Sequence, residues 1–245
     1  MVRPLHIAAV AALAVALAPP AGATAATLPP TSPPSMVKLS DELLTTKWAY
    51  TADLQPVFSR PSGAAHRVAR LRLLTEDGFP EVYLVLASWK SPVGNTWLKI
   101  RVPERPNGLT GWVRGSALGD LRTVHTALRV NKHTLRVTLY DHGRRRFSAR
   151  IGVGKAGTPT PTGHFWIREK FHVGGHTLYG PRAIGTSAYA PSLSEWPGGG
   201  VVGLHGTDQP GLIPGRPSHG CIRLRNRDIM RLYKLAPKGT PVDIV

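Results

Sequence analysis

The side chains of this chain that could take part in catalysis lie around its single cysteine, Cys221, in the segment Ser218-His219-Gly220-Cys221. A lone thiol cannot form an internal disulfide, so another role is expected. A thiolate is a strong nucleophile, and a nearby imidazole can accept the thiol proton. His219 lies two residues before Cys221, and thirteen residues separate it from His205. One thiol and two imidazoles therefore predict a Cys–His pair with a second histidine as a helper.

Two other interpretations of these side chains stay open. The thiol could be an inert, buried small hydrophobe. Alternatively, the thiolate and the imidazoles could bind Zn²⁺, since both are zinc ligands. Three further histidines could then supply a fourth ligand: His164, His172 and His176. Because both histidine motifs accompany the cysteine, nucleophilic chemistry without a metal or a cofactor is the preferred hypothesis.

Residues 124–245 are expected to form the β-rich unit that positions these side chains. Alternating apolar residues over 135–139 and 147–153, on either side of an Asp-His-Gly turn, predict a hairpin with one buried face. Further strands are predicted at 164–168, 201–205 and 240–245. A helix is predicted over 226–235, with Asn226 as its N-cap.

Residues 170–200 lack clear periodicity and are rich in glycine and proline. A long irregular stretch in a compact domain is often a lid or a binding loop. We therefore expect a lid here, hinged at Gly174-Gly175.

An antiparallel barrel is predicted over residues 47–120. Apolar residues alternate in 81–87 and 96–102, and a further short strand begins at Gly111-Trp112-Val113. The pattern resembles a bacterial SH3-like domain, and Trp97 and Trp112 are expected in its core rather than on a ligand platform.

The amino terminus predicts export. Residues 1–25 carry a short positive region, an apolar run and small residues suited to cleavage, which indicates a signal peptide. Residues 26–46 begin with a proline-rich stretch and are interpreted as a linker. After cleavage we expect no stable transmembrane segment, and we expect the mature protein at the cell wall.

The formal net charge of +17 predicts attraction to polyanions. For an exported chain these are anionic wall polymers, phospholipid head groups or peptide carboxylates, and no nucleic acid is expected. The simpler reading of any one basic cluster, such as Arg144-Arg145-Arg146, is a solvated surface.

Several motifs together resemble the L,D-transpeptidase catalytic domain family. His205-Gly206-Thr207 followed by the segment 218–224, Ser-His-Gly-Cys-Ile-Arg-Leu, is similar to the family's catalytic signature. The segment 157–163 is similar to the stretch before the family's lid, and Thr177-Leu178-Tyr179-Gly180 resembles the stretch that carries its lid tyrosine. The resemblance spans about 124–245. It implies a mostly β protein, in which a small SH3-like barrel precedes a β-rich catalytic domain with one helix near its C-terminal end.

The resemblance also implies roles for single residues. It makes Cys221 the nucleophile and His205 the base, with the imidazole oriented by the Gly206 carbonyl, the task of an Asp in other triads. His219 would stabilise the site beside the thiolate. Backbone N–H groups around Gly220 and Cys221, with Tyr179, would form the oxyanion hole. Three residues would contact substrate: Tyr179, Ser218 and Arg223.

The implied reaction is acyl transfer between peptidoglycan stem peptides. The thiol would attack the bond between a diamino acid and the terminal D-Ala of a tetrapeptide stem, and the resulting thioester would acylate an amine of another stem. Pairing with an imidazolium would lower the thiol pKa. Two alternatives remain: a Cys–His peptidase or carboxypeptidase of stem peptides, and a non-catalytic wall-binding protein.

Overall fold

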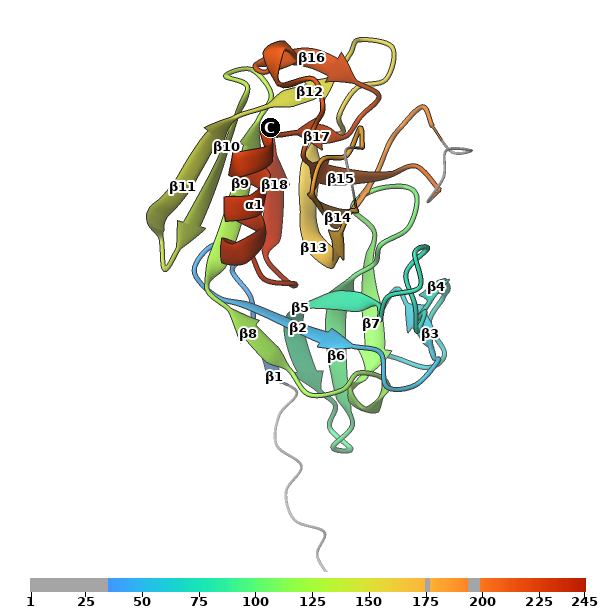
Figure 1. The fold of residues 1–245 in the computed structure, drawn as a ribbon. Coiled ribbons are helices and arrows are strands. Elements are labelled where there is room, and N and C mark those ends of the chain that lie inside the picture. The colour runs from blue at the N-terminus through green and yellow to red at the C-terminus, as the bar shows by residue number, and fades with distance from the viewer. Residues whose placement is uncertain (1–34, 175–176, 194–198) are drawn as a thin grey trace, which may run out of the picture. The chain divides into compact units, whose positions relative to one another are not determined.

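The computed structural model describes residues 35–174, 177–193 and 199–245 (Figure 1). The described chain is mostly β and forms two sheets and one α-helix, which confirms the predicted fold class. None of the described helices has the length and apolar character needed to cross a membrane. The predicted signal peptide and residues 26–34 of the predicted linker lie outside the described residues.

The first sheet has the strand order β4-β3-β7-β6-β5-β2-β8, and β1 pairs with β5 beside this path. Its elements are β1 Ser35–Lys38, β2 Thr46–Tyr50, β3 Pro56–Phe58, β4 Arg67–Arg70, β5 Val82–Lys90, β6 Thr96–Arg101, β7 Thr110–Arg114, the short 3₁₀ helix η1 Gly115–Ala117 and β8 Arg122–Val124. The strands predicted near 81, 96 and 111 are confirmed, while an SH3-like identity for this sheet stays a prediction.

The described part of the predicted linker is not a free spacer. Ser35–Lys38 form β1, in which Val37 pairs with Ser88 of β5. β1 pairs with residues 87–90 of β5, beyond the part of β5 that pairs with β2, and this pairing satisfies backbone N–H and C=O groups of both strands.

The core of this sheet follows from the period-two pattern of its strands. Leu98, Ile100 and Val113 are buried in one apolar cluster. Trp97 and Trp112 are buried in a second cluster, where the Trp97 ring meets Phe58 edge-on at 5.8 Å. The two tryptophans are core residues, as predicted.

The second sheet carries the cysteine and both catalytic histidine candidates. Its strand order is β11-β10-β9-β18-β13-β14-β15-β17-β12-β16. Its elements are β9 Thr126–Asn131, β10 Arg136–Asp141, β11 Arg144–Arg150, β12 Gly152–Gly154, β13 Gly163–His172, β14 Arg182–Tyr189, β15 Val201–His205, the short 3₁₀ helix η2 Pro210–Leu212, β16 Gly215–Ser218, β17 Ile222–Arg223, α1 Asn226–Leu235 and β18 Pro241–Ile244.

Local patterns predicted several of these elements correctly. β10 and β11 form the expected hairpin, with Val137 opposite Ala149. The strands expected at 164–168, 201–205 and 240–245 correspond to β13, β15 and β18.

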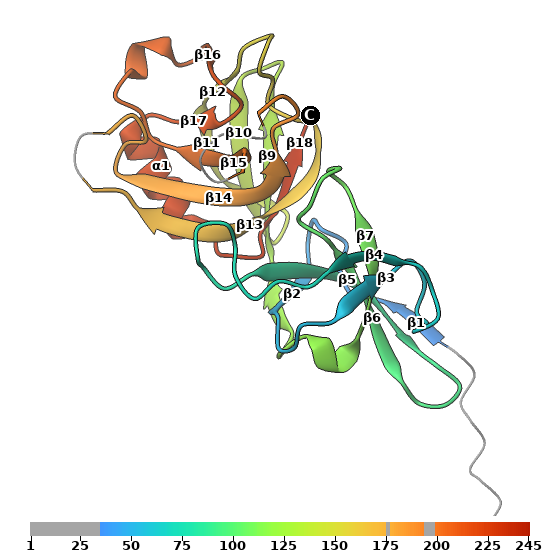
Figure 2. The ribbon, with the colours of Figure 1, turned by 90° about the vertical axis from the view of Figure 1, so that its right-hand side faces the viewer.

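The prediction of an irregular segment over 170–200 is wrong for much of its length. β13 continues to His172, and β14 occupies Arg182–Tyr189 between β13 and β15 (Figure 2). Four consecutive buried residues of β14 are small or polar, namely Gly185, Thr186, Ser187 and Ala188. Because this strand is buried through its pairing with distant segments, its sequence shows no alternation of polar and apolar residues that would predict it. Of the predicted hinge, Gly175 lies outside the described residues.

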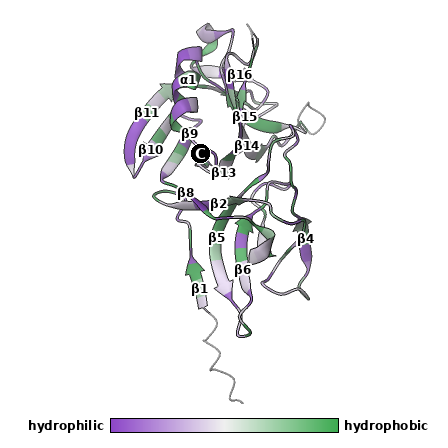
Figure 3. Cartoon of the chain, turned by 60° about the horizontal axis from the view of Figure 1, so that its bottom comes forward, coloured by the Kyte–Doolittle hydropathy of each residue, from purple (hydrophilic) through white to green (hydrophobic). Residues whose placement is uncertain are grey.

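Helix α1 is amphipathic, and hydrophilic residues cover much of it in Figure 3. It buries Ile229 and Leu232 against the sheet. Asn226 does not cap the helix, contrary to the prediction, because the N-cap is Arg225 and no side chain caps it.

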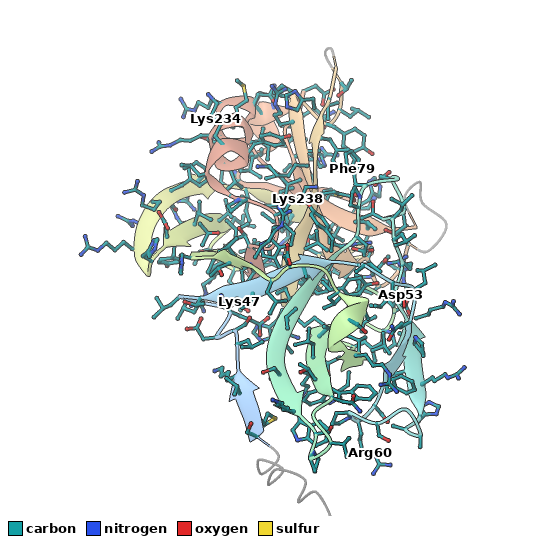
Figure 4. All side chains as sticks on the ribbon, turned by 90° about the horizontal axis from the view of Figure 1, so that it is seen from below. Lys47, Asp53, Arg60, Phe79, Lys234 and Lys238 are labelled. Atoms are coloured by element: carbon teal, nitrogen blue, oxygen red, sulfur yellow. The ribbon has the colours of Figure 1, made fainter. Side chains whose placement is uncertain are left out.

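The described surface is strongly basic, in keeping with the composition. Many lysine and arginine side chains are exposed, and Lys234, labelled in Figure 4, is one of them. Arg145, Arg146, Arg231 and Lys234 line one shallow depression beside α1.

Candidate active site

Cys221 opens into a cavity of about 200 Å³ that it shares with His205, His219 and Tyr179. Ser218 and Arg223 also line it, so six of the eight predicted site residues meet in one place. β15 and β17 run parallel, with Leu204 opposite Ile222. This register places the end of β15, which carries His205, beside the start of β17, which Cys221 directly precedes.

His205 is held in a single tautomer by the chain that follows it. Its Nδ1 lies 2.6 Å from the carbonyl oxygen of Gly206. A carbonyl only accepts hydrogen bonds, so Nδ1 carries the proton and Nε2 keeps a lone pair. The imidazole can therefore accept a proton through Nε2.

The loop that supplies this carbonyl is braced by Asn226. Its Oδ1 accepts a hydrogen bond from the Thr207 N–H at 2.9 Å. A Cβ on Gly206 would lie 2.4 Å from that oxygen, and one on Gly180 would lie equally close. Only glycines allow the two backbones to meet around this amide group, which explains the glycine after His205.

The same junction brings Tyr179 to the imidazole. Gly180 adopts a φ of +63°, and the neighbouring Tyr179 ring contacts the His205 ring at a centroid distance of 4.8 Å. The tyrosine is 43% exposed, so it covers the histidine on the solvent side. This arrangement fits a residue of a lid rather than of the core.

Hydrogen bonds fix the loop that carries the thiol. The Ser218 hydroxyl donates to the Cys221 carbonyl at 2.5 Å, and the Gly220 N–H donates to the same hydroxyl oxygen at 3.2 Å. The buried Thr160 hydroxyl donates to the Gly220 carbonyl at 2.7 Å and accepts from the Gly154 N–H at 2.9 Å. The loop is therefore anchored on both sides of the cysteine.

These bonds bear on two of the predicted roles. The Gly220 N–H is engaged by the Ser218 hydroxyl, and its φ of +123° requires a glycine at this position. Ser218 is 1% exposed, and its hydroxyl is used inside the loop that carries Cys221.

Burial shifts the pKa values of both His205 and Cys221. It lowers the pKa of His205 to about 4, with a further lowering by the charge of Arg223, although the Gly206 carbonyl acts in the opposite direction. Burial also raises the pKa of the Cys221 thiol, against the effect of the Gly203 N–H and of Arg223. Near neutral pH the pair is thus a neutral thiol and a neutral imidazole. The expected lowering of the thiol pKa by an imidazolium does not occur here.

Arg223 stands beside both reacting groups. Its Nη1 donates to the Gln209 side chain at 3.2 Å, and its buried Nε has no hydrogen-bond partner among the described residues. A guanidinium with an uncommitted N–H at a cavity wall can bind an anionic group.

A second cavity, of about 500 Å³, reaches the same thiol. Cys221, His205 and Tyr179 line it together with Glu169 of β13 and Asp77 of the loop between β4 and β5. Cys221, His205 and Tyr179 therefore border both cavities.

Residues 125–244 match the family model described as the YkuD L,D-transpeptidase catalytic domain. The C-terminal half belongs to the L,D-transpeptidase catalytic domain family. The resemblance predicted from the cysteine and histidine motifs is thereby confirmed.

Relatives of the L,D-transpeptidase domain occur in several bacteria. YkuD of Bacillus subtilis, whose name marks it as a candidate L,D-transpeptidase, is 36% identical over 120 residues, which cover 49% of this chain and 65% of that protein. The probable L,D-transpeptidase YbiS of Escherichia coli is 30% identical over 139 residues, with 50% and 45% of the two chains covered. This chain therefore spans less than two thirds of these relatives. Among solved structures, the NMR structure of the catalytic domain from the E. faecium L,D-transpeptidase shows 26% identity, a TM-score of 0.37 and coverage of 49% and 96%.

Of the three further histidines considered as zinc ligands, the two that the structure describes have other partners. His164 lies 3.2 Å from Asp243, and His172 contacts the Tyr233 ring edge-on. His176 lies outside the described residues. Within 35–174, 177–193 and 199–245, no three His, Cys, Asp or Glu side chains cluster as metal ligands would.

Sequence reasoning missed four residues of the L,D-transpeptidase domain that shape this site. They are Thr160, Gly203, Asn226 and Glu169. Thr160 had a usable signal, since it belongs to the motif 157–163, but that motif was assigned to the approach to the lid. Asn226 was predicted as a helix N-cap, and its bond to the Thr207 N–H was missed. Gly203 and Glu169 act through pairing between distant segments and carried no local signal.

Proposed function

We propose that this protein is an L,D-transpeptidase that acts on peptidoglycan stem peptides outside the cytoplasmic membrane. The observation that carries the proposal is the Nδ1–carbonyl contact of His205 beside the only thiol of the chain. The relatives of the catalytic domain, which are named as L,D-transpeptidases, support it. The signal peptide over 1–25, the linker before the first sheet and the SH3-like identity of residues 47–120 are parts of the same proposal.

Catalysis begins with the neutral pair. As the substrate carbonyl approaches, Nε2 of His205 takes the thiol proton and Sγ of Cys221 attacks the carbonyl carbon of the diamino acid–D-Ala bond. A neutral imidazole is ready to accept this proton near neutral pH, because its pKa is about 4.

The negative oxygen of the tetrahedral intermediate needs donors. The Gly220 carbonyl is bound by Thr160, and a trans peptide directs the following N–H the opposite way. The Cys221 N–H is therefore the backbone donor that we assign to the oxyanion, with the Tyr179 hydroxyl and His219 beside it. One such donor contributes about 10²–10³ in rate.

Two steps complete the reaction. The imidazolium returns its proton to the departing D-Ala amine, and the C–N bond breaks to leave a thioester on Cys221. An amine of another stem then attacks the thioester carbonyl, the C–S bond breaks, and an amide crosslink forms. The thiol regains its proton through His205.

The donor stem is assigned to the smaller cavity. Its walls are largely apolar, with Leu178, Ala190 and Val202 among them, and Arg223 supplies the positive charge. The D-Ala carboxylate is the anion next to the scissile bond, so Arg223 is the group that we assign to it.

The test uses purified protein with a tetrapeptide stem and an amine acceptor, followed by mass spectrometry. The expected result is loss of D-Ala together with a crosslinked product, and neither with Cys221→Ala. A carbapenem should add its mass to Cys221 and leave Cys221→Ala unmodified. An adduct that persists in Cys221→Ala contradicts the assignment of the nucleophile.

The same assay separates the two alternatives. Free tripeptide without crosslinked product indicates a peptidase or carboxypeptidase. No D-Ala release, with unchanged binding of Cys221→Ala to isolated walls, indicates a wall-binding protein.

A further inference from the structure

Glu169 lines the larger cavity, and one of its carboxylate oxygens has no hydrogen-bond partner among the described residues. The residue is 0% exposed, and its Oε2 accepts a hydrogen bond from the Thr75 hydroxyl at 2.5 Å. Its Oε1 is buried and has no hydrogen-bond partner within the described residues. A buried carboxylate oxygen without a partner is costly, so the fold keeps it for a reason other than stability.

A row of glycines connects this carboxyl to the thiol. Glu169 of β13 lies opposite Gly185 of β14, and Gly185 lies opposite Gly203 of β15. The Gly203 N–H in turn donates to Sγ of Cys221 at 3.5 Å. The two intervening positions are glycines, so β14 and β15 place no side chain between the carboxyl and the thiol. The backbones of β13 and β15 lie two strand spacings apart, roughly 10 Å.

The space above Gly185 is already used by the glutamate. A Cβ there would lie 2.5 Å from Cγ and from Oε1 of Glu169. The side chain thus lies across β14 in the direction of Cys221. A bulge at Arg168 precedes it, and bulges of this kind redirect side chains next to active sites.

The first sheet closes this cavity through the loop that carries Thr75 and Asp77. Asp77 lines the cavity, and the Phe79 ring packs edge-on against Phe171 of β13 at 5.0 Å. A second carboxylate therefore faces the same space as Glu169.

The two cavities beside Cys221 differ in charge. Arg223 belongs to the smaller one, whereas Glu169 and Asp77 belong to the larger one. In an acyl transfer of the proposed kind, the donor carries a carboxylate, which a cationic cavity suits. The acceptor amine arrives as a cation, which an anionic cavity suits. We propose that the larger cavity is the acceptor subsite and that Glu169, assisted by Asp77, binds the incoming primary amine as its ammonium form; this assignment rests on the function proposed above.

The carboxylate also serves the chemistry of aminolysis. An ammonium must lose one proton before its nitrogen can attack the thioester carbonyl, and Glu169 takes that proton. The nitrogen then forms the C–N bond as the C–S bond breaks, and its second proton passes through His205 to the sulfur of Cys221. Glu169 releases its proton to solvent, which balances the reaction.

The protonation of Glu169 suits this task. Burial raises its pKa to about 7, and Asp77 and Glu76 add to the rise, while Thr75 and Arg168 oppose it. The imidazoles of His172 and His205 line the same cavity. A carboxyl with a pKa near 7 can ionise when an ammonium binds beside it. It can then accept the proton that the ammonium loses.

The first experiment measures binding and does not depend on turnover. Nα-acetyl-lysine amide and its uncharged analogue Nα-acetyl-norleucine amide are titrated into the protein by NMR. Glu169→Gln should weaken binding of the lysine probe about tenfold or more and leave the norleucine probe unchanged. Asp77→Asn, at an exposed position, should weaken the lysine probe about two- to fivefold.

The second experiment separates the two amines that a crosslinking reaction contains. D-Ala release reports acylation by the donor stem, and product formation with Nα-acetyl-lysine amide or with uncharged methoxyamine reports aminolysis. Glu169→Gln should raise the KM for the lysine acceptor about tenfold or more, with a much smaller loss for methoxyamine and for D-Ala release. Asp120→Asn, an exposed carboxylate away from both cavities, is the matched control and should match the wild type.

Defined outcomes overturn the proposal. Equal binding of the lysine probe by wild type, Glu169→Gln and Asp77→Asn removes the ammonium site. Equal losses in acylation and aminolysis assign the site to the donor's own amine instead. Failure of the wild type to release D-Ala refutes the proposed function, and the binding experiment then still decides whether the cavity recognises an ammonium.

Discussion

At the scale of single residues, the reacting pair is stored in its uncharged form. His205 is 5% exposed, and burial holds its pKa near 4, while burial raises that of the Cys221 thiol. A neutral thiol outside the cytoplasm is less open to oxidation than a thiolate, because oxidation follows thiolate character. The site therefore relies on proton transfer during attack rather than on a standing thiolate.

The pH dependence of acylation tests this description. The imidazole must be neutral to accept the thiol proton, so kcat/KM for D-Ala release should fall only as the pH drops toward about 4, instead of near the usual 6.5. Arg223→Gln removes a charge that lowers the His205 pKa, so the acid limb should move to higher pH. Arg227→Gln, on the exposed side of α1, should leave the limb in place.

The free energy of unfolding should also depend on the protonation of His205. The lowered pKa means that the unfolded chain binds a proton at His205 before the folded chain does, so stability is present above pH 6.5 and is lost as the pH falls toward 4. The expected loss is about 3 kcal/mol from this group. An acid limb near pH 6.5 in the wild type would contradict the neutral-pair description.

At the scale of elements, the sequence predicted what depends on local order. The β10–β11 hairpin, β15 and helix α1 each bury one apolar face. The apolar residues of that face recur at strand or helical spacing in the sequence, so the sequence predicts it directly. The residues of the catalytic signature lie where their order implied, because β15 and β17 pair in parallel at the site.

What the sequence did not predict depends on pairing between distant segments. β14 is buried on both sides and lacks alternation. The Asn226 amide lies at the start of a helix, as an N-cap would, yet it binds the Thr207 N–H of another segment. Gly185 and Gly203 become adjacent only through the strand register. None of these relations has a fixed spacing along the chain.

Thr160 shows how such a relation supports the nucleophile. Its hydroxyl joins the Gly154 N–H to the Gly220 carbonyl, both next to the catalytic loop. Thr160→Val keeps the shape and removes both bonds, which should destabilise the protein by about 1–3 kcal/mol. The freed Gly220–Cys221 peptide should also slow D-Ala release about tenfold or more.

Thr160→Ser is the matched control, because it keeps the hydroxyl and loses only a methyl group. It should retain most of the acylation rate. Equal rates for the serine and valine variants would show that the hydroxyl does not position the loop.

At the scale of the whole described chain, an ionic network joins the first sheet to β13. Arg168 is 0% exposed; its Nε donates to Glu81 at 2.7 Å, and its Nη2 contacts both Glu81 and Glu76. Trp166 adds a bond from its indole N–H to the Val82 carbonyl at 2.7 Å. These contacts hold the loop with Thr75 and Asp77 against the cavity of Glu169. We infer that the first sheet serves the active site through this loop.

The energy of that network can be measured with a pair of arginine variants. Arg168→Met leaves Glu81 buried without its main partner and should lower the free energy of unfolding by about 3–5 kcal/mol in urea. Arg146→Met removes an exposed arginine that lies 3.8 Å from Asp141, and it should change stability by about 0–1 kcal/mol. The double variant Arg168→Met/Glu81→Leu removes both buried charges and should recover most of the loss, since a buried ion pair gains little over well-packed apolar groups. A single Arg168→Met variant as stable as Arg146→Met would mean that the Arg168–Glu81 pair adds nothing to the free energy of unfolding.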